Sequence, residues 1–372
     1  MRVAYYTEQE PEYRRRFAGG WIGWGLIVAI VIAASVVSFV PSNYVIEWPG
    51  PTHDTLGTID DNGEPVAVVD IPSQQTYPTT GSLTMLTVSK IGDPEHPANW
   101  LQVFEAWVDP SQDFIPMEQA FPSGQTFEQS AEVNAAMMKQ SQQDAVAAAL
   151  EAAGYEYTTI IDVVEVDPDG PSADLILPGD VVTAVNGQVA TDIDGLRALV
   201  GASGVDKPLT VTVTRDGAPL DVPITPVLGT GDDPQPILGI SPTITYDFPF
   251  EVSIQLGDIG GPSAGQILAL AIIDKLTPGS LNGGLAVAGT GTITADGQIG
   301  AIGGITQKLY GAKAAGSHYF LAPASNCDDI AAGTVPQGLD IYAVSTLADS
   351  LYVLNTLSTG AGTSLLPRCP TE

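Results

Sequence analysis

The stretch that decides the fold reads Gly257-Asp258-Ile259-Gly260-Gly261-Pro262-Ser263-Ala264-Gly265, and an apolar helical run over 266–276 follows it directly. Apolar residues at alternate positions over 250–256 predict a short strand before it. Ser263 therefore lies where a glycine-rich turn enters a helix. Free backbone N–H groups at such a place suit a developing oxyanion. A serine there can instead cap its helix, and this segment alone leaves both roles open.

A serine hydroxyl needs a base before it can act as a nucleophile. The pentapeptide 261–265 fits G-x-S-x-G, but the α/β-hydrolase order Ser, acid, His is poorly met, since His318 is the only later histidine. Lys308 is the other candidate. It borders the apolar stripe of a helix predicted over 305–313, after two glycines. Such a lysine is usually a surface charge, whereas burial would lower its pKa enough for it to accept a proton.

The segment from 260 to 330 resembles the proteolytic domain of Lon, a Ser-Lys peptidase. The matching pieces occur in the family's order, at 261–265, 288–294, 297–308, 314–316 and 320–326. The resemblance implies that Ser263 is the nucleophile, Lys308 the general base and Thr290 a support for the lysine. It also implies an oxyanion site at the backbone of Gly261, Pro262 and Ala264. Lon enzymes commonly carry an acidic residue three positions before the serine, where this chain has Gly260, with Asp258 further back.

Residues 158–228 form a β-rich unit in which turn signals separate strand-like runs at 159–166, 180–185, 209–215 and 222–225. One helix fits at 192–200. The order of these elements, with Leu177-Pro178-Gly179-Asp180 and Asn186-Gly187, resembles a PDZ domain of bacterial proteases. A PDZ groove accepts an extended peptide as an added strand. The alternative is a β-rich spacer without a ligand.

The resemblance extends to earlier segments, because a strand pattern at 81–88 and a helix at 127–153 resemble the beginning of a Lon peptidase domain. We therefore expect an α+β fold in which a PDZ domain interrupts a Lon-type proteolytic domain. The expected divisions are a cytoplasmic N-terminus at 1–20, a transmembrane helix at 21–42, a stalk with first strands at 43–78, an N-terminal peptidase segment at 79–155, the PDZ domain at 156–230, a C-terminal peptidase segment with the dyad at 231–358 and a flexible tail at 359–372. The Gly- and Pro-rich stretch 228–242 is expected to be a linker.

An apolar run at 21–40 follows Arg14, Arg15 and Arg16. About 20 apolar residues span a bilayer as a helix, and basic residues stay on the cytoplasmic side. This predicts a single-pass protein of the cytoplasmic membrane, with a cytoplasmic N-terminus and an extracytoplasmic catalytic region. A cleaved signal peptide is the alternative.

The formal net charge of −30 argues against nucleic acid as a partner, because phosphate binding needs Lys and Arg. No G-x-x-x-x-G-K-[ST] motif occurs, so no ATP site of that type is expected. The histidines show no metal-ligand spacing, and neither a metal nor another cofactor is expected. Cys327 and Cys369 could form one disulfide or stay free.

These observations predict an ATP-independent, membrane-anchored serine endopeptidase that resembles the PDZ-containing Lon-like proteases of bacteria. The PDZ domain is expected to recruit protein or peptide substrates through extended or C-terminal segments. The resemblance also allows a ring of identical copies. The alternative is a non-catalytic binding or scaffold protein, in which the PDZ domain accompanies an inactive peptidase fold.

Overall fold

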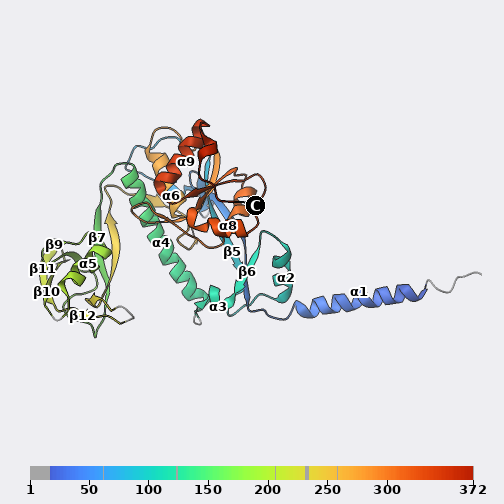
Figure 1. Ribbon diagram of the computed structural model, residues 1–372, viewed down its shortest axis with the longest axis horizontal. Helices are drawn as coiled ribbons and strands as arrows, with labels where there is room; N and C mark the ends of the chain where they lie inside the picture. Colours follow the sequence, from blue (N-terminus) through green and yellow to red (C-terminus); the bar gives the residue numbers. More distant parts are fainter. Residues whose placement is uncertain are drawn as a thin grey trace, which may run out of the picture.

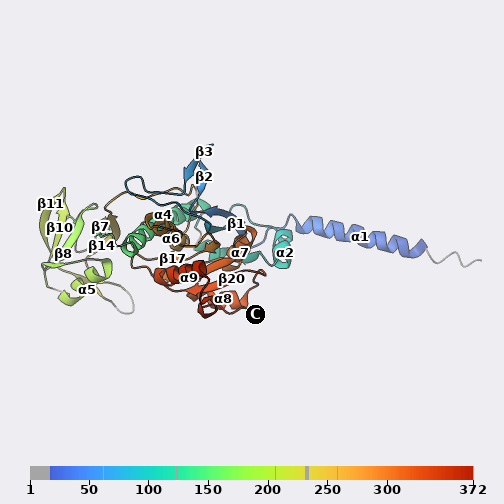
Figure 2. The same cartoon turned by 90° about the horizontal axis from the view of Figure 1, so that it is seen from above.

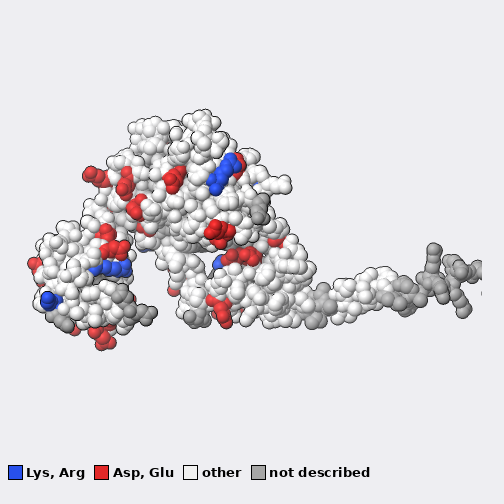
Figure 3. Space-filling view, viewed as in Figure 1, with Lys and Arg blue, Asp and Glu red and all other residues white. Residues whose placement is uncertain are grey.

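The computed structural model describes residues 17–61, 63–122, 125–205, 207–230, 234–257 and 259–371. Within these residues, the chain forms two compact regions, as Figures 1 and 2 show. Each region is built around its own sheet and hydrophobic core. Acidic side chains are scattered over both regions of the face seen in Figure 3, where basic side chains are few. The molecule is thus a mixed α/β protein in which the hydrophobic core of the smaller region is separate from the core of the larger region.

The larger region is built on a six-stranded sheet with the order β20-β19-β16-β5-β1-β6. Neighbouring strands from β20 to β5 are parallel, whereas β1 is antiparallel to both β5 and β6. Three strands of the parallel half, β16, β19 and β20, are largely buried, as expected where helices cover both faces of a sheet. The strands are β1 (Tyr44–Asp54), β5 (Ser82–Ile91), β6 (Asp113–Pro116), β16 (Ala286–Gly289), β19 (Tyr319–Pro323) and β20 (Asp340–Val344).

Helices pack around this sheet and bring distant segments together. The long helix α4 (Phe127–Ala152) lies against α6 (Gly265–Leu276), which is buried along nearly its whole length. The helix α7 (Ile305–Ala314) lies on β1 and β5, and α9 (Leu347–Thr359) packs against α6. The remaining helices are α2 (Trp100–Val108), α3 (Met117–Ala120) and α8 (Cys327–Ala332).

Short antiparallel ladders complete the larger region. They join β2 (Thr58–Asp61) to β3 (Glu64–Ala67), β4 (Val69–Asp70) to β15 (Ser253–Ile254), and β17 (Thr292–Ile293) to β18 (Ile299–Gly300). The strand predicted over 250–256 is therefore only two residues long. It nevertheless fixes the chain shortly before the Ser263 turn.

The smaller region is an antiparallel sheet with the order β11-β10-β8-β7-β14, and α5 (Ile193–Ser203) lies against β8 and β14. Its hairpin turns at Asn186-Gly187 and Asp216-Gly217 have positive φ at both residues. This is the backbone that tight two-residue turns require and that Asn, Asp and Gly tolerate. The strands are β7 (Thr158–Val166), β8 (Val181–Val185), β9 (Gln188–Val189), β10 (Leu209–Arg215), β11 (Ala218–Ile224) and β14 (Ile240–Asp247), and β12 (Val227–Leu228) pairs with β13 (Pro236–Ile237) separately.

The predicted linker over 228–242 ends earlier than expected, because its last residues begin β14. This strand pairs with β7 along eight residues, from Ile240–Val166 to Asp247–Thr158. The glycine and proline residues of this stretch indicated a linker rather than a strand. β14 is defined only by its pairing with β7, which lies far away in the chain. The smaller sheet therefore includes residues beyond position 230.

The N-terminal apolar run forms the helix α1 (Phe17–Val37), and residues 1–16 lie outside the described residues. A membrane span needs about 20 consecutive apolar residues in one helix. No helix in the described stretches of the chain is long and apolar enough to meet this requirement. That finding contradicts the predicted transmembrane helix at 21–42, and with it the predicted single-pass location in the cytoplasmic membrane.

The C-terminal segment, predicted to be a flexible tail, is attached along much of its described length. Cys369 forms a disulfide with Cys327 of α8, and Leu366 is buried in the core of the larger region. The Arg368 guanidinium donates to the Asp340 carboxylate at 2.7 Å. A disulfide, an apolar anchor and an ion pair together hold the tail against β20 and α8.

Candidate active site

Ser263 and Lys308 come from different elements and meet at one point. Lys308 Nζ donates to Ser263 Oγ at 2.7 Å and to Thr290 Oγ1 at 3.1 Å. The Thr290 hydroxyl in turn donates to the Ser263 carbonyl oxygen at 3.0 Å. The three predicted residues thus form one hydrogen-bonded cluster, in which Thr290 touches both the lysine and the serine.

Lys308 is not the surface charge that its place on an amphipathic helix allowed, since it is only 3% exposed. Burial lowers its pKa to about 7, while the nearby Glu47 carboxylate acts in the opposite direction. A lysine with this pKa is about half deprotonated at neutral pH, and a general base must be deprotonated to accept a proton. The geometry therefore places a lysine that can be neutral within hydrogen-bonding distance of a half-buried hydroxyl.

Ser263 does not cap the helix that follows it. The N-cap of α6 is Ala264, which makes no side-chain capping bond. The backbone of Ser263 is instead fixed through its carbonyl oxygen, which also accepts the Gly291 N–H at 3.0 Å. With the backbone held in this way, Oγ is left to face Lys308.

The turn that carries Ser263 rests on α4. Ser141 Oγ donates to the Pro262 carbonyl oxygen, and the Gly261 N–H donates to the Asn134 carbonyl oxygen, each at 2.8 Å. Asn134 and Ser141 are seven positions apart, so they lie on the same face of the helix. Sequence reasoning placed a helix over 127–153 but assigned these two residues no role. The only signal was the resemblance of this helix to the beginning of a Lon peptidase domain.

These bonds narrow the choice of oxyanion donors. The Gly261 N–H is already engaged by Asn134, and proline has no N–H to donate. The prediction named Gly261, Pro262 and Ala264 together. Of these, only Ala264 has a backbone N–H that can serve, and the Ser263 N–H joins it as a candidate.

Gly260 stands where Lon enzymes commonly carry an acidic residue, and it lies close against α4. A Cβ added at this position would lie 3.0 Å from Asn134 Cβ and 3.4 Å from the Asn134 carbonyl carbon. A side chain here would therefore require a shift of a few tenths of an ångström between the turn and α4. Asp258 lies outside the described residues and gives no structural account.

We expect Gly260→Asp to lower the rate of peptide cleavage about threefold, because the contact with Asn134 would displace the turn by a few tenths of an ångström, and a displacement of about 1 Å at a nucleophile can cost two orders of magnitude. Comparing kcat of the variant and the parent protein checks this result. Combining it with Asn134→Gly removes the nearest atom and should restore some of the rate. An unchanged kcat in Gly260→Asp would contradict the expected clash.

The dyad opens into a cleft of about 1180 Å³ between α4, the turn over 257–264 and β5. Apolar side chains such as Met85, Leu86 and Val88 line it, together with few charged ones. One charged pair is Glu47 and Lys90, which lie opposite each other on β1 and β5 and form an ion pair at 3.0 Å. The cleft therefore has room for an extended peptide next to Ser263 Oγ.

The competing base does not reach this site. His318 is exposed and is not among the residues that line the cleft. Lys313, on the same helix as Lys308, donates to the Gly338 carbonyl oxygen on the surface. The contact with Ser263 therefore favours Lys308 over the histidine that a hydrolase triad would use.

Two family models match the chain. Residues 255–356 match the Lon protease (S16) C-terminal proteolytic domain, and residues 124–225 match a PDZ domain. The first range contains the Ser263–Lys308 contact. The second begins before α4 and ends before β14, whereas the antiparallel sheet extends from β7 to β14.

Similar proteins include Lon protease 1 of Sorangium cellulosum (strain So ce56), which is 39% identical over 94 residues, or 24% of this chain and 11% of that protein. The Lon protease of Azospirillum brasilense is 35% identical over 117 residues, or 30% of this chain and 14% of the relative. The chain thus spans a small fraction of the length of these curated relatives. None of these similarities indicates a ring of identical copies of this chain.

Among solved structures, the PDZ domain of the SdrC-like protein from Listeria innocua is 18% identical, with a TM-score of 0.21. The match covers 22% of this chain and 92% of that structure.

Proposed function

Since the chain carries a proteolytic domain of the Lon serine peptidase family beside a PDZ domain, we propose that it is an endopeptidase whose catalytic dyad is Ser263 and Lys308. The single observation that supports this most strongly is the 2.7 Å contact between Ser263 Oγ and a buried lysine whose pKa is lowered to about 7. Nucleophile and base within hydrogen-bonding distance, with a third group on the base, are the arrangement of a covalent hydrolase.

In the proposed reaction, Ser263 Oγ attacks the carbonyl carbon of the scissile peptide while neutral Lys308 takes the hydroxyl proton. The negative charge on the carbonyl oxygen is stabilised by the backbone N–H groups of Ser263 and Ala264. Collapse of this intermediate breaks the C–N bond, and the leaving amine receives the proton from Lys308. Water then hydrolyses the acyl ester with Lys308 again as the base, which frees Ser263.

The smaller sheet supports a role in peptide recruitment. β14 is the last strand of its sheet, so its outer edge can pair with an added strand, and α5 lies beside it. A PDZ domain binds an extended peptide in this way. We propose that β14 and α5 hold a segment of the protein substrate, and that cleavage needs no nucleotide, because the sequence contains no G-x-x-x-x-G-K-[ST] motif.

The test uses the full chain and an unfolded protein such as casein, without nucleotide. We expect cleavage by the parent protein and a loss of at least about a thousandfold in Ser263→Ala, because the nucleophile is required for the covalent step. Circular dichroism verifies that the variant stays folded. Cleavage that persists in Ser263→Ala would reject the dyad, and peptide binding without any cleavage would favour the scaffold alternative.

A further inference from the structure

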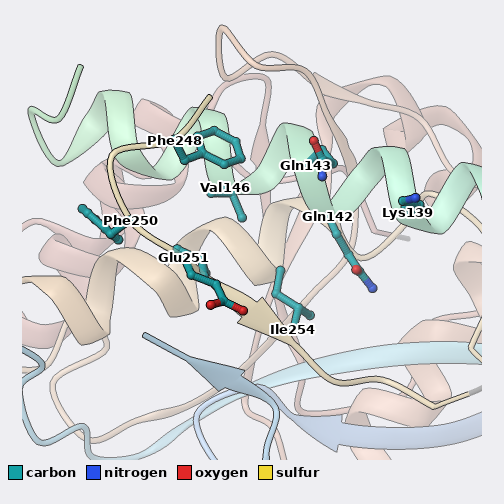
Figure 4. A pocket seen from close by; sticks show the side chains of 9 residues that line it. Lys139, Gln142, Gln143, Val146, Phe248, Phe250, Glu251 and Ile254 are labelled. Atoms are coloured by element: carbon teal, nitrogen blue, oxygen red, sulfur yellow. The ribbon is translucent and has the colours of Figure 1, made fainter. Parts of the chain in front are cut away.

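A second cavity, of about 440 Å³, lies between α4 and the segment over 248–254 (Figure 4). Its apolar lining comes from Val146 on α4 and from Phe248, Phe250 and Ile254 on the opposite wall. Lys139, Gln142 and Gln143 add polar groups along the helix, and Glu251 adds a carboxylate on the opposite wall.

This cavity adjoins the catalytic cleft, because Lys139 and Gln142 line both. These two adjoining hollows, which we call the groove, lie along α4 between Ser263 and the segment following β14. From Lys139 to Val146 the helix rises about 10 Å, at 1.5 Å per residue. That length accommodates about three residues of an extended peptide, at about 3.3 Å each.

The charges along the groove are unevenly placed. Lys139 is exposed at the junction of the two cavities and forms no ion pair within the stretches of chain that the structure describes. Glu251 lines only the second cavity, so it lies away from the cleft. In a chain with a net charge of −30, an unpaired lysine at this junction is a local site of attraction for a negative group.

We propose that this groove is a binding site for the polypeptide substrate beyond the scissile bond, and that it selects an acidic side chain next to Lys139. An apolar side chain two residues further along would then rest on Val146, Phe248 and Ile254, because every second side chain of an extended peptide points to the same face. The inference rests on the proposed peptidase function, to which it adds a class of preferred substrate.

The test uses fluorogenic peptides of equal length with one cleavable bond, in which Glu or Lys is placed position by position on both sides of that bond. At one position we expect the Glu peptide to have a KM about fivefold lower than the Lys peptide, with kcat unchanged, as fits one exposed charge pair. Lys139→Glu should reverse this preference, and Lys139→Met should remove it. Replacing Leu by Ser two residues beyond the acidic position should raise KM again.

Lys207→Glu is the matched control, because it changes the net charge equally at an exposed residue that lines neither cavity. Equal preferences in Lys139→Glu and Lys207→Glu would overturn the proposed site. Fluorescence anisotropy of the same peptides with Ser263→Ala measures binding separately from cleavage. If the parent protein cleaves nothing but binding still follows the charge at position 139, the peptidase proposal fails while the groove stands.

Discussion

Lys308→Met is expected to abolish cleavage of an unfolded protein while the fold remains intact. Methionine matches the length and apolar stem of lysine but cannot accept the Ser263 proton. A general base contributes about 10²- to 10⁴-fold to the rate, and its loss is larger where base and nucleophile act as a unit. We therefore expect initial rates to fall by at least about a thousandfold, measured with the same substrate and protein concentration as for the parent.

The pH dependence of the parent protein should follow the proton on Lys308. Because burial lowers its pKa to about 7, the side chain is mostly protonated below this pH and mostly neutral above it. Only the neutral form accepts the Ser263 proton, so kcat/KM should rise with pH through about 7 and then level off. A rate that falls as the pH rises through this range would contradict Lys308 as the base.

Stability measurements separate lost chemistry from lost structure. Lys308 has a folded-state pKa of about 7 against an ordinary value of 10.5. Between these values the unfolded chain binds a proton that the folded chain has released. The parent should therefore gain stability as the pH rises through this window, and Lys308→Met should lack that gain.

Lys313→Met is the matched control for the same helix. Among the hydrogen-bond partners found in the described residues, its Nζ contacts only the Gly338 carbonyl oxygen and not Ser263. We expect its cleavage rate to stay within about twofold of the parent. A comparable loss in both lysine variants would indicate that α7 has been disturbed, rather than that a base has been removed.

Local sequence signals predicted the elements that hold the dyad. The 127–153 helix is α4, which begins with a capping box at Thr126 and Gln129 and is followed by Gly154 at positive φ. The runs after Ser263 and around Lys308 are α6 and α7. These features depend on side-chain periodicity and end signals within a few turns of helix, which the sequence itself displays.

Features that depend on distant contacts were not predicted. β14 needs β7 as its partner, and Asn134 and Ser141 gain their roles only from a turn more than 100 positions later. The burial of Lys308 likewise depends on β1 and β5, which no helical pattern reveals. The apolar N-terminal run led to a wrong prediction, because its hydropathy and the arginines before it predicted a membrane span that no helix of the described chain provides.

Removing the Cys327–Cys369 disulfide should produce the largest loss of stability of any tail variant. The bridge closes a loop of 42 residues. In the chain-entropy account, a loop of this length restricts the unfolded chain enough to stabilise the fold by about 4 kcal/mol. We expect the double variant Cys327→Ser with Cys369→Ser to lower the free energy of unfolding by about this amount in urea titrations.

This loss should reach the active site, because Cys369 packs in the same core cluster as Ile305, Leu309 and Ala312 of α7. The bridged tail thus packs in the same core as the helix that carries Lys308. Heating should therefore inactivate the double variant at a lower temperature than the parent, while kcat at low temperature remains close to that of the parent.

Arg368→Ala is the control that loosens the tail but leaves the bridge intact. Its ion pair with Asp340 is about half exposed on both sides, and such pairs contribute about 1 kcal/mol or less. If the urea midpoint of Arg368→Ala shifted as far as that of the double cysteine variant, tail packing rather than the covalent link would account for the stability. Reductant added to the parent protein should lower the midpoint as the double variant does and leave that of the double variant unchanged, since only the parent has a disulfide to lose.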